Sequence, residues 1–437
     1  MKPVKIGLLG LGTVGCGTVN VLGRNATEIS RRAGRGIEIG HAAARDVERA
    51  RDCDTSTMRL STDPMAVVND PDVDVIVELM GGDGLAREAM MAAIDAGKHV
   101  VTANKALIAK HGNAIFEAAQ EKGVMVAFEA AVAGGIPIIK AVREGLAGNR
   151  IEWLAGIING TGNFILTEMR DKGREFADVL AEAQALGYAE ADPTFDVEGI
   201  DAAHKLTILA SIAFGMPLRF DRVYCEGIGH IAREDVTYAE ELGYRIKHLG
   251  FARQGGAGVE LRVHPTLIPE RRLIANVDGV MNAVLVHGDA VGPTLHYGAG
   301  AGAGPTASAV VADLVDVVRA LTSDPENRVP HLAFQPDAID DRPVLDIEAV
   351  RTSYYLRLQA ADRPGVLADI TRILGEKGIS IEAMMQKEPL GDAPDSATII
   401  MLTHQVEEQA MNAAINGIQA LPSVLGEVTR IRMEPLG

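Results

Sequence analysis

The sequence is short of cysteine and of basic charge, and each shortage argues against a class of protein. Its three cysteines are Cys16, Cys53 and Cys225, and no CxxC pair occurs. This pattern argues against a disulfide framework and against a cysteine-ligated structural zinc site. Acidic residues outnumber basic residues by 59 to 42, which gives a net charge of −17. No basic surplus is therefore available to meet the phosphates of a nucleic acid or of an anionic membrane.

Long apolar runs are lacking as well. No uninterrupted apolar stretch reaches the length that spans a bilayer. The N-terminus reaches Gly7 and Gly10 too early to form the hydrophobic region of a signal peptide. We therefore expect a cytoplasmic protein with neither a membrane nor a nucleic acid as its partner.

Glycine, in contrast, is abundant. The 437 residues include 47 glycines, and 47% of the chain is hydrophobic while 23% is charged. These proportions are typical of a globular protein and argue against a disordered chain. The length predicts two or three domains rather than one core.

A glycine motif follows the first predicted strand. Residues 4–9 are aliphatic and β-branched, residues 10–15 read GLGTVG, and helix-spaced apolar residues follow. Gly10 suits a tight turn, Gly12 lets backbone amides approach a pyrophosphate, and Gly15 lets the helix pack on its strand. The order of strand, GxGxxG and helix predicts a dinucleotide site. The alternative is a glycine-rich turn without a ligand.

The end of the second predicted strand bears on the choice of cofactor. Residues 37–44 form that strand, and Arg45 and Asp46 follow it. An acid at this position usually holds the ribose hydroxyl of NAD, whereas an arginine accommodates the 2′-phosphate of NADP. Arg45 therefore favours NADP, and a surface salt bridge with Asp46 or a neighbour is the alternative.

Further strand and helix units complete a parallel sheet. Residues 73–78 are an almost wholly apolar strand, residues 85–96 a helix ending at Gly97, and residues 98–102 another strand. This alternation is typical of a doubly wound α/β sheet, whose ligands lie beyond the carboxyl ends of the strands. Lys105 follows such an end, although a solvated loop lysine would look the same.

The middle of the chain carries two segments that pattern alone leaves open. Glu129 is followed by small residues and glycines up to Pro137, which fits either a monovalent-cation loop with oxygen ligands or a hinge between domains. Residues 188–199 hold four acids in a short loop, which suits a solvated loop or a bound cation. The amides of residues 159–163 suit either orienting a ligand or capping a helix.

A helix beginning near Gly199 carries the clearest pair of charges. Asp201 and Lys205 are four residues apart and share one helix face, which continues as an apolar face. A pair at the surface would contribute little to stability. A pair in a crevice would suit proton transfer, and the apolar flank favours that interpretation.

The remainder predicts a glycine-rich lead into a helix and then a separate small domain. Glycines alternate from 298 to 304 before a helix at 306–320, forming a second backbone cradle or a flexible lead-in. Residues 324–348 contain four prolines and read as a linker. From residue 354 the predicted elements follow the order βαββαβ of a ferredoxin-like unit, whose Pro-Gly loop before a helix suits an amino-acid carboxylate.

Taken together, these motifs resemble those of homoserine dehydrogenase with a C-terminal ACT domain, over nearly the whole chain. The resemblance rests on the following stretches: residues 10–15, TANK at 102–105, NGT at 159–161, GYAEADP at 187–193, Asp201 with Lys205, residues 302–308, and ADRPGVL at 361–367. It implies an α/β fold with a Rossmann-type domain at 1–128, an α+β catalytic and dimerisation domain at 129–325, a linker at 326–350 and a ferredoxin-like ACT domain at 351–437.

The resemblance also implies an activity and residue roles. The activity is the interconversion of L-homoserine and L-aspartate 4-semialdehyde with NADP or NAD, in threonine and methionine biosynthesis. Roles in catalysis or substrate binding fall to Lys205, Asp201, Lys105 and Glu190. Cofactor contacts fall to Gly10, Gly12, Thr13, Val14, Gly15, Arg45, Lys105 and Gly302. A Na⁺ or K⁺ site falls to Glu129, Val132, Gly134 and Ile136, which favours the cation loop over the hinge.

Regulation and assembly are expected by the same resemblance. The ACT unit implies feedback control by an amino acid, with threonine the leading candidate, and a homodimer or homotetramer. Two other functions remain: a related reductase of another amino-acid semialdehyde or 2-amino acid, and a non-catalytic sensor of dinucleotide and amino acid. The joint presence of Glu190, Asp201 and Lys205 argues against both.

Overall fold

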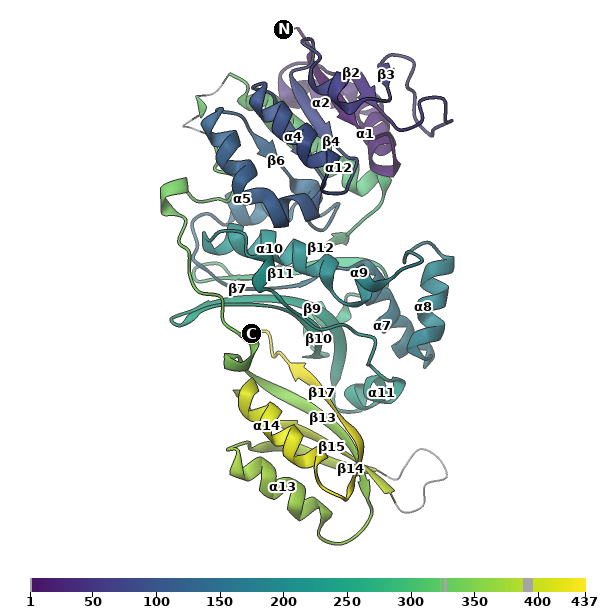
Figure 1. The fold of residues 1–437 in the computed structure, drawn as a ribbon, viewed down its shortest axis with the longest axis vertical. Coiled ribbons are helices and arrows are strands. Elements are labelled where there is room, and N and C mark those ends of the chain that lie inside the picture. Colours follow the sequence, from purple (N-terminus) through teal and green to yellow (C-terminus); the bar gives the residue numbers. More distant parts are fainter. Residues whose placement is uncertain (1, 323, 326–327, 388–395) are drawn as a thin grey trace. The chain divides into compact units, whose positions relative to one another are not determined.

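The computed structural model describes residues 2–322, 324–325, 328–387 and 396–437 (Figure 1). The chain divides into two compact units, each built from three segments of sequence. Unit 1 comprises Met1–Gly160, Asp201–Val223 and Val280–Arg342, and unit 2 comprises Thr161–Ile200, Tyr224–Gly279 and Pro343–Gly437.

Unit 1 contains a six-stranded parallel sheet in the order β3-β2-β1-β4-β5-β6. Its strands are β1 (Val4–Leu9), β2 (Ile37–Ala43), β3 (Arg59–Ser61), β4 (Val75–Glu78), β5 (His99–Thr102) and β6 (Val126–Ala127). The helices between and around them are α1 (Thr13–Arg24), α2 (Ala26–Ala33), α3 (Pro64–Val68), α4 (Leu85–Asp95), α5 (Lys105–Glu121) and α12 (Ala303–Ala320). Every residue of β4 and β5 is buried, because helices cover both faces of a parallel sheet. The predicted doubly wound domain is confirmed.

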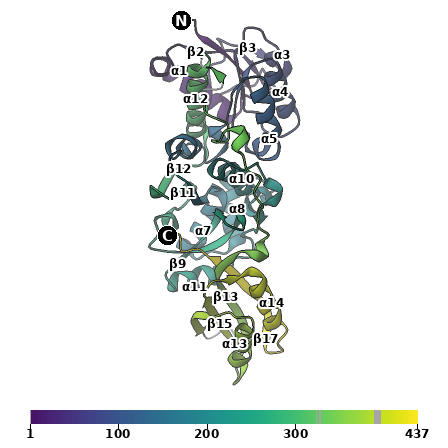
Figure 2. The same ribbon diagram turned by 90° about the vertical axis from the view of Figure 1, so that its left-hand side faces the viewer.

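Helix α12 returns from late in the sequence to pack on α1 (Figures 1 and 2). A Cβ at Gly17 of α1 would lie 2.4 Å from the carbonyl oxygen of Ala303, so the two helices approach more closely there than any side chain would allow. Buried valines and leucines of α12 join one apolar core with those of β1 and α1. Gly17 thus lets α12, which comes about 280 residues later in the sequence, pack into the core of the first domain.

The rest of unit 1 includes three strands that pair in antiparallel fashion. Strand β11 (Met281–Gly288) pairs with β7 (Ile151–Ile157) on one side and with β12 (Gly292–Ala299) on the other. Helix α10 (Ile200–Phe214) is buried along nearly its whole length. The short helix α6 (Ile138–Lys140) follows the loop that begins at Glu129.

Unit 2 ends in the predicted ferredoxin-like domain. Its elements follow the order β13 (Arg351–Ala361), α13 (Val366–Glu376), β14 (Ile381–Lys387), β15 (Ser396–Thr403), α14 (Glu408–Gln419) and β17 (Val424–Met433). The strands pair in the order β17-β13-β15-β14, and the two-residue strand β16 (Val406–Glu407) pairs with β13. Tyr354 and Leu356 face a core with α13 and α14, whereas Tyr355 faces a core with elements of the preceding segments, as the period of two in a strand requires.

Those preceding segments contain both helices and strands. They comprise α7 (Gly160–Lys172), α8 (Phe176–Ala185), α9 (Thr194–Val197), β8 (Tyr224–Cys225), α11 (Arg233–Glu241), β9 (Tyr244–Gly255) and β10 (Gly258–Pro269). Strand β10 pairs with β17 in parallel, so the ACT sheet continues the β9–β10 hairpin. Buried Asp235 of α11 accepts hydrogen bonds from Tyr355 Oη at 3.0 Å and from Arg357 Nε at 2.6 Å. The ACT strand β13 is thereby fixed to its neighbour by charge as well as by packing.

Several predicted bounds shift in the structure. Helix α12 begins at Ala303, three residues before the predicted start at 306, because Pro305 is tolerated in a first helical turn. The predicted linker contains single turns at Pro336–Ala338 and Ile347–Ala349, while its residues 326–327 lie outside the described residues.

In the part of the chain that the structure describes, every helix is too short or too polar to cross a membrane.

We expect two histidines of unit 1, the buried His99 and the partly buried His331, to cause a loss of stability in acid. His99 Nδ1 accepts a hydrogen bond from Met125 N at 2.9 Å, and His331 Nε2 accepts one from Val126 N at 3.1 Å. Burial, with nearby arginine charge, lowers the pKa of each from 6.5 to about 4. The two histidines therefore cost no free energy of unfolding above a pH of about 6.5. As the pH falls towards 4, the free energy of unfolding decreases by at most about 1.4 kcal/mol per pH unit for each histidine.

Thermal unfolding between pH 7.5 and 4.5 measures this loss, and H99N with H331Q supplies the control. Asn and Gln keep an acceptor near the original nitrogen but do not titrate. The double variant should show a shallower fall of Tm with acid than the unsubstituted chain. Parallel pH profiles would contradict the assignment.

Candidate active site

The glycine turn after β1 has the geometry that a dinucleotide needs. Gly10 has φ +104°, and a Cβ at Gly15 would lie 2.1 Å from the carbonyl oxygen of Gly10. Only glycine fits at either position. A Cβ at Gly12 would meet nothing within 4 Å, so this face of the turn is open to a ligand. Helix α1 begins at the next residue, Thr13, and no side chain caps its N-terminus, which leaves the backbone N–H groups for phosphate oxygens.

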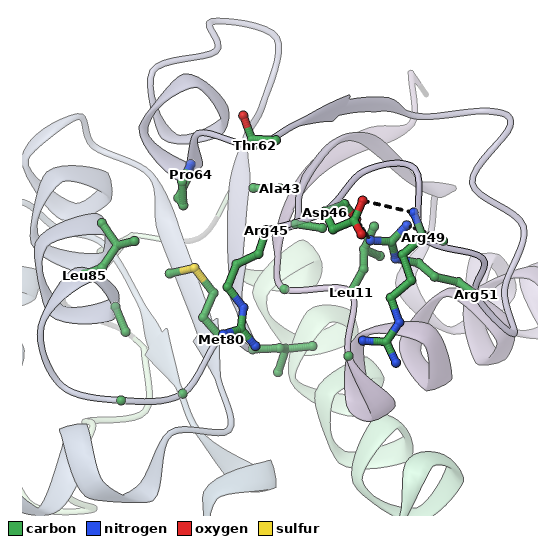
Figure 3. A pocket seen from close by; sticks show the side chains of 17 residues that line it. Leu11, Ala43, Arg45, Asp46, Arg49, Arg51, Thr62, Pro64, Met80 and Leu85 are labelled. Carbon is green, nitrogen blue, oxygen red and sulfur yellow. Dashed lines mark hydrogen bonds between the residues drawn. The ribbon is translucent and has the colours of Figure 1, made fainter.

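A pocket of about 800 Å³ opens beside this turn (Figure 3). Its lining comes from the end of β2, from the residues that follow β1, β2, β3 and β4, and from the first residues of α3 and α4. They are Gly10, Leu11, Gly12, Ala43, Ala44, Arg45, Asp46, Arg49, Arg51, Thr62, Pro64, Leu79, Met80, Gly81, Gly82, Leu85 and Ala86. Figure 3 shows the three arginines on the side of the pocket away from Leu85. An open glycine turn, a helix N-terminus and clustered arginines fit a phosphorylated dinucleotide.

The arginines of the pocket have different surroundings. Arg51 donates to the carbonyl oxygens of Val47 and Arg49 at 3.3 and 2.7 Å and also to that of Asp46, so it holds the loop after β2 together. The Asp46 carboxylate accepts the N–H groups of residues 48 and 49. Among the described residues, neither Arg45 nor Arg49 has an acidic side chain as an ion-pair partner, and both are exposed. The salt-bridge alternative for Arg45 is therefore not what the structure shows.

A second cluster of charges is centred on Asp201 of α10. Its Oδ2 lies 2.7 Å from Lys205 Nζ, and its Oδ1 lies 2.6 Å from Nζ of Lys105, the first residue of α5. Asn159 Nδ2 donates to Oδ2 at 2.8 Å, and Lys205 Nζ donates to the carbonyl oxygen of Ile158 at 2.6 Å. Asp201 is 3% exposed, Lys205 is buried, and the Lys105 side chain is 34% exposed.

The electrostatics of this cluster follow from its composition. Burial raises the pKa of the Asp201 carboxyl, but the charges and hydrogen bonds of Lys205 and Lys105 outweigh burial, and the net pKa lies well below its usual range. Asp201 therefore remains ionised at neutral pH. A single carboxylate holds two ammonium groups, one buried and one partly exposed, which is an arrangement suited to proton transfer to a polar substrate.

The loop from Glu129 to Ile136 is buried and has an unusual backbone. Ala133 and Gly134 have φ +53° and +45°, and a Cβ at Gly134 would lie 2.5 Å from the carbonyl oxygen of Gly300. The Glu129 carboxylate accepts the N–H groups of Ile139 and Lys140 at 2.8 and 2.9 Å. It is thus engaged at the start of α6, and main-chain carbonyl oxygens are the groups with which this loop would hold a hard cation.

Comparison with known proteins assigns the chain to a family. Family models match for the NAD-binding domain of homoserine dehydrogenase over residues 10–129, for homoserine dehydrogenase over residues 137–315 and for the ACT domain over residues 354–422. A homoserine dehydrogenase of Pseudomonas aeruginosa is 68% identical over 436 residues, which cover 100% of both chains. The chain belongs to the homoserine dehydrogenase family.

Solved structures of the homoserine dehydrogenase family agree. One from Thiobacillus denitrificans is 68% identical, with a TM-score of 0.95 over 100% of this chain and 99% of that one. A hyperthermophilic archaeal homoserine dehydrogenase in complex with NADPH is 26% identical, with a TM-score of 0.63 over 72% of this chain and 98% of that one.

Membership of the homoserine dehydrogenase family gives the reaction. The chain is an NAD(P)-dependent oxidoreductase that interconverts L-homoserine and L-aspartate 4-semialdehyde in threonine and methionine biosynthesis, as the sequence predicts.

The structure brings some of the predicted site residues together. Lys205, Asp201 and Lys105 form one cluster, and Gly10, Gly12 and Arg45 line one pocket. Thr13, Val14 and Gly15 open helix α1, and Gly302, with φ +117°, is the N-cap of α12. None of these four lines the pocket. Glu190 is exposed in the loop between α8 and α9 of unit 2, where Gln184 Nε2 donates to its carbonyl oxygen at 3.1 Å.

The structure also adds residues to which sequence reasoning gave no specific role. Asn159 donates to the central Asp201 carboxylate, and Arg49 lines the pocket beside Arg45. A signal for Arg49 is present in the sequence, since residues 45–51 contain three arginines directly after a predicted strand. The amides of residues 159–163 are visible in the sequence, but the partner of Asn159, 42 residues away, is not.

Proposed function

We propose that Lys205 is the proton donor in the reduction of the aldehyde and that Asp201 holds it in position. The observation that carries this proposal is the buried Asp201 carboxylate, bound to Lys205 Nζ at 2.7 Å and to Lys105 Nζ at 2.6 Å. When bound, the nicotinamide supplies the hydride that adds to the aldehyde carbon. The carbonyl oxygen then takes a proton from the Lys205 ammonium, and homoserine oxidation reverses both transfers.

The two lysines have different proposed roles. Lys205 is buried, and its Nζ donates hydrogen bonds to the Asp201 carboxylate and to the Ile158 carbonyl oxygen. These hydrogen bonds hold its ammonium group in one place. Lys105 is partly exposed at the start of α5. We assign Lys105 to electrostatic support of the substrate and cofactor, because a pre-oriented cation near a developing alkoxide lowers the barrier.

NADP is the proposed cofactor in preference to NAD. Arg45 and Arg49 line the pocket, are exposed, and follow β2, where the adenosine ribose of a bound dinucleotide lies in this fold. The archaeal relative whose structure contains NADPH supports the same preference.

A monovalent cation is the proposed ligand of the loop at 129–136. The main-chain carbonyls of Glu129, Val132, Gly134 and Ile136 are the proposed donors, since the Glu129 side chain is already hydrogen-bonded by two backbone N–H groups. Neutral carbonyl oxygens suit Na⁺ or K⁺ better than a divalent ion, which needs carboxylate charge.

Glu190 is the proposed partner of the substrate's ammonium group, and its substitution tests the substrate class. E190Q removes the negative charge, so kcat/KM for aspartate semialdehyde should fall about 10- to 100-fold, the usual loss for one hydrogen bond to a charged group. The same variant should leave kcat/KM for succinate semialdehyde, which lacks the amino group, close to its original value. Steady-state rates with both aldehydes measure the difference.

The exposed acid Glu198, which follows α9 directly, provides the control, and E198Q should behave as the unsubstituted chain. If E190Q lowers kcat/KM equally for the two aldehydes, this result would contradict the role of Glu190 in recognising the amino group.

Threonine is the proposed effector, and a pocket in the ACT domain supports this proposal. The pocket has a volume of about 310 Å³ and is lined by residues 361–367 together with Gln386, Ala397 and Ile399. It lies at the N-terminus of α13, where Asp362 can meet an ammonium group and the helix N-terminus a carboxylate. An effector that binds in the ACT domain needs a coupling free energy of about 1–3 kcal/mol to change the catalytic rate measurably.

Threonine should therefore inhibit the unsubstituted chain, and D362A should lose this inhibition while keeping kcat within about twofold, because Asp362 belongs to the effector pocket alone. Initial rates across a threonine series, with E376A at the far end of α13 as the control, test this. Equal inhibition of D362A and E376A, or none of the unsubstituted chain, would refute the assignment.

Assembly as a homodimer or homotetramer and a cytoplasmic location complete the proposal. Strand β14 ends the ACT sheet order in the described residues, and Met384 on it is exposed, which suits pairing with a second copy. The three cysteines are free, as a reducing compartment requires.

A further inference from the structure

A buried carboxylate outside the two clusters connects the cofactor pocket with the start of α5. Glu78 is the last residue of β4 and is 0% exposed. Its Oε1 accepts the N–H groups of Met80 at 2.8 Å and Gly81 at 3.2 Å, and its Oε2 accepts the Thr102 hydroxyl at 2.7 Å. In the part of the chain that the structure describes, this carboxylate has no ion-pair partner and is held by neutral donors alone.

On one side, Glu78 fixes a loop of the cofactor pocket. Met80, Gly81 and Gly82 line that pocket, and Figure 3 shows the Met80 side chain between Leu85 and Arg45. Gly81 and Gly82 have φ +74° and +77°, so the loop has a backbone conformation that needs support from outside itself. The two hydrogen bonds to Glu78 Oε1 provide it.

On the other side, Glu78 is linked to the residue before Lys105. The Thr102 hydroxyl, which donates to Glu78, accepts the N–H of Asn104 at 3.0 Å. Asn104 is the N-cap of α5, because its Oδ1 accepts Leu107 N at 3.1 Å. Its Nδ2 donates to the carbonyl oxygen of Gly82 at 2.7 Å, so Asn104 is also hydrogen-bonded directly to the pocket loop.

The cost of this arrangement argues for a purpose beyond stability. A carboxylate buried without a cation is expensive even when it is hydrogen-bonded, and apolar residues stabilise a core at lower cost. The hydrogen bonds of Glu78 also have one direction only: the Thr102 hydroxyl has a single proton, which it gives to Glu78, and a lone pair, which it offers to Asn104. Such a network fixes two backbones relative to each other.

We propose that Glu78, acting through Thr102 and Asn104, is a positioning residue that sets the Met80–Gly82 loop of the cofactor pocket and the placement of Lys105 together. This inference rests on the proposed function, because it takes Lys105 and the pocket as parts of the active site. It assigns to Glu78 no contact with the reacting atoms.

Three variants test the network. T102V removes the hydroxyl at nearly constant volume. E78Q replaces one acceptor oxygen by an N–H₂ donor, which must face either the Thr102 hydroxyl or the N–H groups of Met80 and Gly81. T102S keeps both hydrogen bonds. Each variant is examined for the dissociation constant of NADPH by fluorescence, for kcat and KM with aspartate semialdehyde, and for Tm. Hydrogen exchange of residues 79–84 and 103–107 is followed in the protein without ligand.

T102V and E78Q should raise the NADPH dissociation constant about tenfold, the size of one hydrogen bond to a charged group, and should lower kcat as well. Amide exchange should accelerate in both segments, and T102S should restore all of these values to within about twofold. Unchanged NADPH binding and unchanged exchange in T102V and E78Q would overturn the proposal. So would a loss in T102S equal to that in T102V, since the hydroxyl would then be irrelevant.

Failure of the proposed function gives a different result. If Lys105 has no part in the reaction, K105A turns over normally, yet the effect of T102V on NADPH binding and on exchange remains. The exchange measurement needs neither substrate nor cofactor, so it tests the Glu78 network whatever the catalytic assignment.

Discussion

Replacement of Lys205 by alanine should lower kcat for aspartate semialdehyde reduction by about 100- to 10,000-fold, the usual contribution of a general acid. The physical reason is that the aldehyde oxygen gains negative charge as hydride arrives, and the buried Lys205 ammonium, fixed by Asp201 and the Ile158 carbonyl, is the proposed source of its proton. NADPH binding should stay within about threefold, because Lys205 does not line the cofactor pocket. Single-turnover rates and NADPH fluorescence titration measure the two quantities.

Lys110 provides the matched control, since it is an exposed lysine of α5 that pairs with Asp83 away from Asp201. K110A should keep its kcat. K105A should show a smaller loss of kcat than K205A, and small primary amines should restore part of the K205A rate by entering the vacated space. A K205A rate near normal would remove Lys205 from the role of donor, and a K105A loss exceeding that of K205A would transfer the role to Lys105.

The second large effect concerns the choice between NADPH and NADH. R45A combined with R49A should lower kcat/KM for NADPH by about 10- to 100-fold, the loss of charge-assisted hydrogen bonds to a phosphate. The value for NADH, which lacks the 2′-phosphate, should change less than about threefold. Steady-state kinetics with each cofactor measure the ratio, and competition by 2′,5′-ADP reports binding of the phosphate independently of turnover.

An exposed arginine away from the pocket serves as the control: Arg31 pairs with Glu28 on α2, and R31A should leave both kcat/KM values unchanged. If kcat/KM of the double variant falls equally with NADPH and with NADH, the arginines stabilise the loop and do not bind the 2′-phosphate. The preference for NADP then has another source.

Much of the fold follows from patterns with a local cause. The apolar strands ending in polar residues predict the parallel sheet, and β4 and β5 are indeed buried throughout. The glycines of residues 10–15 fit their predicted physical roles, with Gly10 in a left-handed conformation and Gly15 against the Gly10 carbonyl. The βαββαβ order at the C-terminus can likewise be predicted, because each strand and helix has its own hydrophobic periodicity. The domain boundaries and the role of each site residue stay predictions.

What could not be predicted depends on contacts between distant residues. Asp201 and Lys205 share a helix face, so their pairing is visible in the sequence, but Lys105 reaches the same carboxylate from 96 positions away. The Glu129 carboxylate suggests a cation ligand, yet in the structure it binds two backbone N–H groups. Glu78 reads only as the end of an apolar strand, and its link to Thr102 arises because β4 and β5 are neighbours in the sheet.

The most direct test of the account is the oxidation of NADPH by L-aspartate 4-semialdehyde, followed by absorbance with the unsubstituted chain and with K205A. The expected result is rapid turnover by the unsubstituted chain, L-homoserine as the product, and a rate for K205A that is lower by at least about 100-fold. Absence of turnover with both NADPH and NADH, or equal rates for the two proteins, would contradict it.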